Sequence, residues 1–211
     1  MKTEILVAII GAIALIAGII LSSVISGVNR KKQAKKNSKE KEWKFILKKL
    51  NDFFYPLRNY LEFSKSYYDM FIKDKPSGFR TLPFLLDPNQ VYEGNVKVSL
   101  SNNDKVVLQQ ILKIGSDIEK LIVEKSAIVD DKEFIGPYIP SEEYSNFDYP
   151  DKEISLLSLL KLHLSAIRLA FEGDLTGEKE YYSKFVFPRE LNKRVTAKIL
   201  QLKTKVDILG S

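Results

Sequence analysis

An uninterrupted apolar stretch near the N-terminus, residues 5–25, constrains this chain more than any other feature. It reads ILVAIIGAIALIAGIILSSVI and contains no charged residue and no proline. A helix of about 20 residues rises roughly 30 Å, which is the thickness of the hydrocarbon core of a bilayer. The stretch therefore predicts a single membrane-spanning helix, with residues 1–28 as the anchor.

The charges around this stretch favour a retained anchor over a cleaved signal peptide. A signal peptide carries its positive charge before an apolar core of roughly 7–15 residues. Here the apolar core is longer and the basic residues follow it. Positive flanking residues stay on the cytoplasmic side. We therefore expect a single-pass protein of the inner (plasma) membrane, with its N-terminus outside and its C-terminal domain in the cytoplasm.

A basic neck, residues 29–42, follows the anchor. Between residues 29 and 50, ten basic residues stand against two glutamates, a net charge of +8, whereas the whole chain carries +6. The rest of the chain is therefore close to −2. The neck lacks the interleaved aromatic residues of nucleic-acid readers, which makes a nucleic-acid partner unlikely. Its expected partner is the anionic lipid surface of the bilayer, contacted by Arg30, Lys31, Lys32, Lys35, Lys36 and Lys39.

Small residues recur at every fourth position of the anchor. Such a stripe lets two membrane helices approach closely, and it predicts a homo-oligomer formed through this face. The alternative is that small residues are simply frequent in membrane helices, and the sequence leaves both interpretations open. The residues concerned are Ala14, Gly18, Ser22 and Ser26.

Hydrophobic periodicity predicts that residues 43–211 form a cytoplasmic all-α domain. Apolar positions at spacings of three and four indicate amphipathic helices that face a core. Residues 154–171 are apolar nearly all round, so this helix belongs in the centre. Pro56 should kink the first helix, and Asn37-Ser38 is the expected break between that helix and the anchor. The expected fold is an antiparallel bundle of about four helices, residues 38–73, 102–128, 152–172 and 188–209, with a small β-hairpin near residues 91–100.

Local signals set several helix ends. Ser101 or Asn102 is the expected N-cap of the second helix. Gly173 ends the third helix, and Pro188 fits the first position of the last helix.

The connection before the third helix, residues 130–152, has no helical period. It contains three prolines, and seven acidic residues stand against two lysines, a net charge of −5. Loops of this length in compact domains are usually functional or disordered, and aromatic rings tend to cover another surface. We expect either a partner-binding loop or a connection wrapped across the end of the bundle. Its aromatic residues are Phe134, Tyr138, Tyr144, Phe147 and Tyr149.

Motifs for catalysis or metal binding are absent from the sequence. The chain has no cysteine and one histidine, so a thiolate nucleophile is excluded and a zinc site or His-based triad is hard to assemble. His163 lies in a leucine-rich stretch and is expected to be a satisfied core residue. Asp130, Asp131 and Glu133 lack the glycine turn and terminal glutamate of a calcium loop, so they are interpreted as solvated acid. We expect no catalytic residue, no metal ligand and no cofactor.

Three motifs carry a resemblance to a protein group. They are FYPLRNYL at residues 54–61, SLLKLHLSAIRLAFEGDL at residues 158–175 and FPREL at residues 187–191. The chain resembles uncharacterised bacterial proteins with one N-terminal membrane helix followed by a cytoplasmic all-helical domain. The resemblance supports this architecture and implies no catalytic residues.

These features together predict a function in binding. The first hypothesis is a membrane-tethered cytoplasmic helical module that binds or scaffolds a protein partner and is not an enzyme. The alternative is a membrane-acting effector or toxin-like component, for example of a phage-defence system, that clusters through its anchor.

Overall fold

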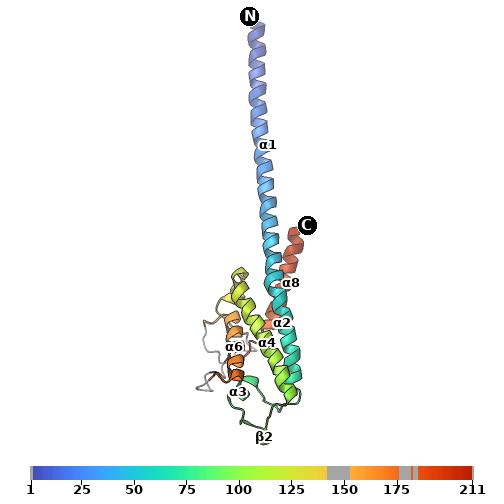
Figure 1. Ribbon diagram of the computed structural model, residues 1–211. Helices are drawn as coiled ribbons and strands as arrows, with labels where there is room; N and C mark the ends of the chain where they lie inside the picture. Colours follow the sequence, from blue (N-terminus) through green and yellow to red (C-terminus); the bar gives the residue numbers. More distant parts are fainter. Residues whose placement is uncertain (1, 142–152, 176–181, 183–184, 211) are drawn as a thin grey trace. The chain divides into compact units, whose positions relative to one another are not determined.

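The computed structural model shows a chain built mainly of helices, which confirms the all-α prediction (Figure 1). It describes residues 2–141, 153–175, 182 and 185–210. Within these ranges it describes side chains from Ser22 onward, except at residues 24 and 25. The first half of the chain contains α1 (Lys2–Lys49), η1 (Leu50–Phe54), α2 (Tyr55–Ile72), α3 (Thr81–Leu86), β1 (Val91–Tyr92) and β2 (Val96–Lys97). The second half contains α4 (Asn102–Lys125), η2 (Ser126–Ile128), α5 (Lys132–Ile135), α6 (Leu156–Glu172) and α8 (Leu191–Gly210).

The N-terminal helix α1 is continuous, so the break predicted at Asn37-Ser38 is wrong. The side-chain amide of Gln33 donates to that of Asn37 at 3.0 Å, one turn along the helix. The Asn37 side chain is therefore engaged on the helix surface and does not compete for the backbone. An ion pair between Lys44 and Glu40, at 2.7 Å, supports the following turn.

The predicted membrane-spanning helix is not found within the described part of the chain, where no helix is both long and apolar enough to cross a membrane. The stretch that predicts it, residues 5–25, lies outside the residues whose side chains are described, apart from Ser22 and Ser23. The anchor therefore stays a prediction.

The irregularity expected at Pro56 takes the form of a π-helical turn, η1, just before it. The backbone N–H of Tyr55 donates to the carbonyl of Leu50, five residues back. Proline has no N–H and its ring crowds the preceding turn, so the normal ladder cannot continue there. Phe53 and Phe54 are both fully buried, with ring centroids 5.3 Å apart in an edge arrangement. The wide turn thus places two consecutive aromatic residues in the core.

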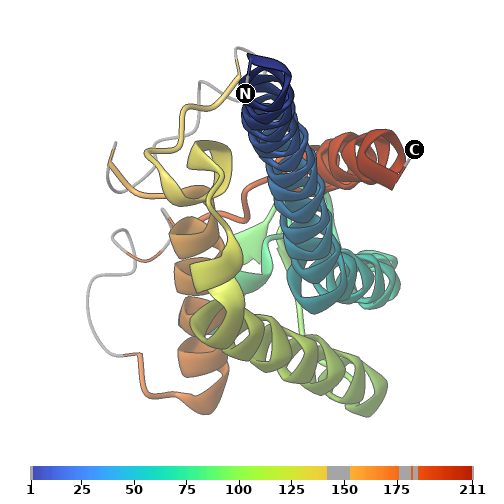
Figure 2. The same cartoon turned by 90° about the horizontal axis from the view of Figure 1, so that it is seen from above.

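Two compact units divide the chain: residues 1–47 with 205–211, and residues 48–204. In the second unit, α4 packs against both α2 and α6, and the three helices alternate in direction (Figure 1). The view from above shows α2 and α6 on different sides of α4 (Figure 2). Leu159 and Leu160 of α6 have no exposed surface, which confirms that this apolar helix is central. Gly115 lets α6 approach α4, because an added Cβ would lie 3.3 Å from Leu164.

The caps predicted for α4 and α6 are present. Ser101 accepts from the backbone of Asp104, whose carboxylate accepts from the backbone of Ser101, which is a complete capping box. Gly173 ends α6 with φ 80°, a left-handed conformation that favours glycine. The N-terminus of α6 lies slightly later than predicted, since Ser155 caps it by accepting from the N–H of Ser158 at 3.1 Å.

The small hairpin predicted near residues 91–100 is present. β1 and β2 pair antiparallel, with Tyr92 opposite Val96. The turn between them uses left-handed conformations at Gly94 (φ 78°) and Asn95 (φ 59°). Tyr92 is buried and its ring lies 5.7 Å from that of Phe79, so the hairpin is supported by the helical core.

The last helix, α8, begins at Leu191, so the prediction that Pro188 occupies its first position is wrong. The N–H of Leu191 donates to the carbonyl of Pro188 at 3.0 Å, which closes a separate turn before the helix. The N–H of Arg194 then donates to the carbonyl of Glu190 at 2.9 Å. The side chain of Glu190, in this turn, binds the connection that precedes α6, as described below.

Candidate functional site

The residues predicted to contact lipid lie on α1. The six cations, Arg30, Lys31, Lys32, Lys35, Lys36 and Lys39, are all exposed. In the small-residue stripe, Ser22 and Ser26 are exposed, and the side chains of Ala14 and Gly18 lie outside the described residues.

Two of the aromatic residues predicted for a partner-binding loop are part of the core. Phe134 has no exposed surface, and its ring packs 5.4 Å from that of Phe54. Tyr138 is also buried, and the guanidinium of Arg194 lies 5.1 Å from the centre of its ring. For these two residues the burial favours a wrapped connection over a partner-binding loop. Tyr144, Phe147 and Tyr149 lie outside the described residues.

Asp130 and Asp131, at the start of this connection, both bind cationic side chains. The interpretation as solvated acid is wrong for Asp131, whose side chain is 20% exposed, whereas Asp130 and Glu133 are exposed as predicted. Asp130 accepts from Lys49, and Asp131 accepts from Lys198. Both lysines are buried, and the hydrogen bond from Lys49 lowers the pKa of Asp130. A buried lysine needs a carboxylate, because an unpaired charge is costly to remove from water. Within the described ranges no cluster of metal ligands occurs.

Glu190 fixes the other end of the described connection to the start of α8. Its carboxylate accepts from the backbone N–H of Ser141 at 2.6 Å and from Arg194 Nε at 2.8 Å. Burial raises the pKa of Glu190, but the hydrogen bonds from Ser141 and Arg194 outweigh burial and leave this pKa below its ordinary value. Glu190 therefore stays ionised and holds the connection in place.

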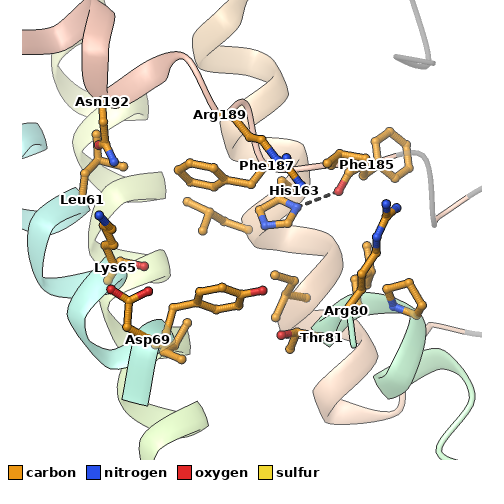
Figure 3. Close-up of a pocket in the computed structure, with 18 residues that line it drawn as sticks. Leu61, Lys65, Asp69, Arg80, Thr81, His163, Phe185, Phe187, Arg189 and Asn192 are labelled. Carbon is orange, nitrogen blue, oxygen red and sulfur yellow. Dashed lines mark hydrogen bonds between the residues drawn. The ribbon is translucent and has the colours of Figure 1, made fainter. Parts of the chain in front are cut away.

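A cavity of about 460 Å³ lies between α2, α3, α6 and the segment that leads into α8 (Figure 3). Figure 3 shows Lys65 and Asp69 on one wall, Arg80 and Thr81 on the opposite wall, and His163 between them. Leu61, Ile111, Leu164 and Ile167 supply much of the apolar lining. A mainly apolar cavity with a few polar side chains is the usual form of a small-molecule site.

His163 is the central polar group of this cavity. Its Nδ1 lies 2.6 Å from the carbonyl oxygen of Phe185, so Nδ1 carries the proton and Nε2 is the acceptor. Burial lowers the pKa of His163 to about 4, although the Phe185 carbonyl opposes this change. The ring is therefore neutral at pH 7. The hydrogen bond agrees with the expectation of a satisfied histidine, but the sequence did not indicate a cavity beside it.

Thr81 and Tyr68 form a second polar part of the wall. Thr81 is 7% exposed, and its hydroxyl is buried without a partner in hydrogen-bonding geometry, although the Tyr68 side chain is close enough to affect it. Burial raises the pKa of Tyr68, whereas the neighbouring Thr81 hydroxyl and then Arg189 and Arg80 act to lower it. Both guanidinium groups thus lie within electrostatic range of the same hydroxyl. A buried hydroxyl without a partner costs about 1–3 kcal/mol, which a bound polar atom would recover.

The charged lining is cationic. Lys65, Arg80 and Arg189 stand against a single carboxylate, Asp69, and these four groups carry a net charge of +2 at neutral pH. All three cations are exposed to solvent at the edge of the cavity. The arrangement can bind an anionic group there and an apolar group farther in.

Proton transfer is poorly supported by this geometry. A histidine with a pKa of about 4 is a weak general base at neutral pH. Among the described residues, the hydrogen bond found for His163 goes to the Phe185 carbonyl and not to a hydroxyl that it could activate.

Sequence reasoning missed the residues that line this cavity. Arg189 falls inside the FPREL motif, and His163 was considered only as a core residue. Lys65, Arg80 and Thr81 belong to segments with no local signal for binding, because only the packing of α2 and α3 beside α6 brings them together.

Comparison with protein-family models, curated proteins and solved structures finds no match for this chain. The resemblance to bacterial single-pass proteins accordingly stays an expectation based on its three motifs.

Proposed function

We propose that this chain is a membrane-tethered cytoplasmic helical module that binds partners and performs no catalysis. The observation that carries the proposal is the order of its segments: an apolar stretch of bilayer length, a fully exposed basic neck and a folded helical unit with an open cavity. The apolar stretch and the neck belong to one helix, α1. This order suits a protein whose role is to hold a binding unit at a membrane surface.

The tether is tested with single cysteines, for which this cysteine-free chain is a ready background. Thr3→Cys and Ser38→Cys are expressed separately in the full chain and treated with a membrane-impermeant maleimide. We expect labelling of Thr3→Cys in intact cells and of Ser38→Cys only after lysis. The reverse pattern would refute the orientation. Recovery of both variants in the soluble fraction would refute the anchor.

A protein partner is supported by exposed apolar side chains on α2. Phe63 and Met70 are each 59% exposed, and their seven-residue spacing puts them on one side of the helix. Replacing Phe63 with p-benzoylphenylalanine in the full chain should give a discrete photo-crosslinked product in cells, which Met70→Ser should weaken. The same replacement at Val123, which is 64% exposed on α4, is the control. Equal crosslinking at both positions would contradict a partner surface on α2.

The small-residue stripe supports a second candidate, an effector that clusters through its anchor. Four small residues at four-residue spacing would let anchors pack closely. Gly18→Ile separates the candidates, because an effector that depends on anchor contacts should lose its activity whereas a tether should keep its partner crosslink.

A further inference from the structure

We propose that the cavity between α2, α3 and α6 binds a phosphate monoester that carries an apolar body. The ester's phosphate would lie at the edge next to Arg80, with Arg189 and Lys65 as the other cations of the lining, and its apolar body would fill the interior. The inference rests on the folded unit, residues 48–204, and holds whether or not the chain is tethered to a membrane.

The charge of the lining selects a dianion. Three cations and one carboxylate leave a net charge of +2, and a phosphate monoester carries about −1.5 to −2 near neutral pH. A carboxylate or a phosphodiester carries one negative charge and would leave part of this charge unbalanced. The neutral His163 adds no charge deeper in the cavity, so the phosphate is directed to the edge.

Two cations of this lining, Lys65 and Arg80, differ from the paired lysines elsewhere in the fold. Lys49, Lys75 and Lys198 each have a carboxylate partner. Within the described ranges, neither Lys65 nor Arg80 has a carboxylate at ion-pair distance. Cations that line a cavity without such partners are suited to an external anion, and arginine matches phosphate geometry with two parallel hydrogen bonds.

Thr81 supplies the independent evidence that a polar ligand belongs here. Its side chain is more than nine-tenths buried and lines the cavity, and its hydroxyl has no partner in hydrogen-bonding geometry, only the neighbouring Tyr68 side chain. Buried polar groups are nearly always satisfied, so one without a partner in a cavity wall needs an explanation. A phosphate oxygen next to Arg80 would accept a hydrogen bond from the Thr81 hydroxyl.

The remaining lining fits the apolar body. The side chains of Leu61, Ile111, Leu164 and Ile167 face the cavity, and its volume of about 460 Å³ is in the range of small-molecule sites, about 300–1,000 Å³. The same chemistry occurs in soluble aromatic phosphates and in single-chain lipid phosphates. The test therefore includes a probe of each kind.

The single histidine makes a local binding assay possible. His163 lines the cavity, so its imidazole C2 proton gives one NMR signal that reports on this site alone. The full chain, in nanodiscs of phosphatidylcholine, is titrated with phenyl phosphate and with dodecyl phosphate. Phenol and dodecanol are the uncharged counterparts of these probes.

We expect a saturable shift of the His163 signal with a phosphate and not with its alcohol. Arg80→Gln and Arg189→Gln should each weaken binding roughly tenfold or more, because each removes a charge-assisted hydrogen bond. Lys105→Gln removes an exposed cation that does not line the cavity, and it should leave affinity unchanged.

Thr81→Val distinguishes a ligand-binding role from a structural one. The variant should weaken phosphate binding, yet it should raise the melting temperature of the unliganded protein because it removes a buried hydroxyl without a partner. Loss of stability together with unchanged binding would contradict the role assigned to Thr81.

The two probes identify the source of the ligand. Tighter binding of dodecyl phosphate supports a lipid-derived ligand, and tighter binding of phenyl phosphate supports a soluble one. The proposal is overturned if neither phosphate shifts the His163 signal at millimolar concentration, or if the alcohols shift it equally. The cysteine-labelling result is independent of either outcome.

Discussion

His163 should make the stability of the folded protein depend on pH in a range where few other groups titrate. Its pKa is about 4 in the folded protein, against an ordinary value of 6.5. The unfolded chain therefore takes up a proton first as the pH falls below 6.5, and the folded state loses stability until the pH reaches about 4. Above pH 6.5 the histidine makes no pH-dependent contribution, because it is neutral in both states.

The magnitude follows from these two pKa values. Their difference corresponds to about 3 kcal/mol in full, and about 2 kcal/mol of this should already be lost at pH 5. The chain has one histidine, and the pKa values of Asp104, Asp130 and Glu190 lie below their ordinary values, so these carboxylates titrate at lower pH. Most of the loss between pH 7 and pH 5 should therefore come from His163.

The assay is urea unfolding of the full chain in a mild nonionic detergent at several pH values, followed by circular dichroism. His163→Asn is the matched variant, since its amide can still donate to the Phe185 carbonyl but does not titrate. Its stability should be nearly constant between pH 7 and pH 5. The reasoning is refuted if both proteins lose the same stability, or if the His163 C2 proton titrates near pH 6.5 in the folded protein.

Three further variants test the packing of the folded unit. Lys198→Met leaves Asp131 partly buried without its cation and should cost about 3–5 kcal/mol of unfolding free energy. Adding Asp131→Leu to this variant should recover most of the loss. A double variant as unstable as the single one would contradict a paired role. Ser101→Ala removes the cap of α4 and should cost about 1 kcal/mol in urea unfolding, with Asn102→Ala as the control that should change little. Gly173→Ala places a side chain at φ 80° and should cost about 1 kcal/mol of unfolding free energy, measured by thermal melting. The same substitution at Gly27, inside α1, should cause no loss of stability. Equal effects at both positions would exclude a conformational cause.

The predictions from sequence were correct where a signal acts within a few residues and wrong where it depends on a distant contact. The cap at Ser101, one of the two predicted candidates, the glycine end at Gly173 and the hairpin near residues 91–100 were correctly predicted, because each depends on hydrogen bonds or backbone angles within a few residues. The start of α8 was predicted too early, because residues 188–190 form a separate turn in which the Glu190 side chain binds Ser141, 49 residues away. The preference of proline for the first position of a helix does not take such a distant contact into account.

The acidic connection shows the same limit. Its charge was visible in the sequence, but the partners of Asp130 and Asp131 are 81 and 67 residues away. Burial of Lys49 and Lys198 turns acidic residues that would be solvated in isolation into obligatory partners.

The sequence by itself determined that this chain is helical, where several of its helices end and that its charge is concentrated behind an apolar stretch, since composition and periodicity act locally. Only the tertiary structure decided which charges are paired, which aromatic residues are buried and which cations line a cavity. The physical reason is that charge pairing, desolvation and cavity shape depend on residues from distant segments. The packing of α2, α3 and α6 brings Thr81, Arg80 and His163 to one site, and no local pattern encodes that arrangement.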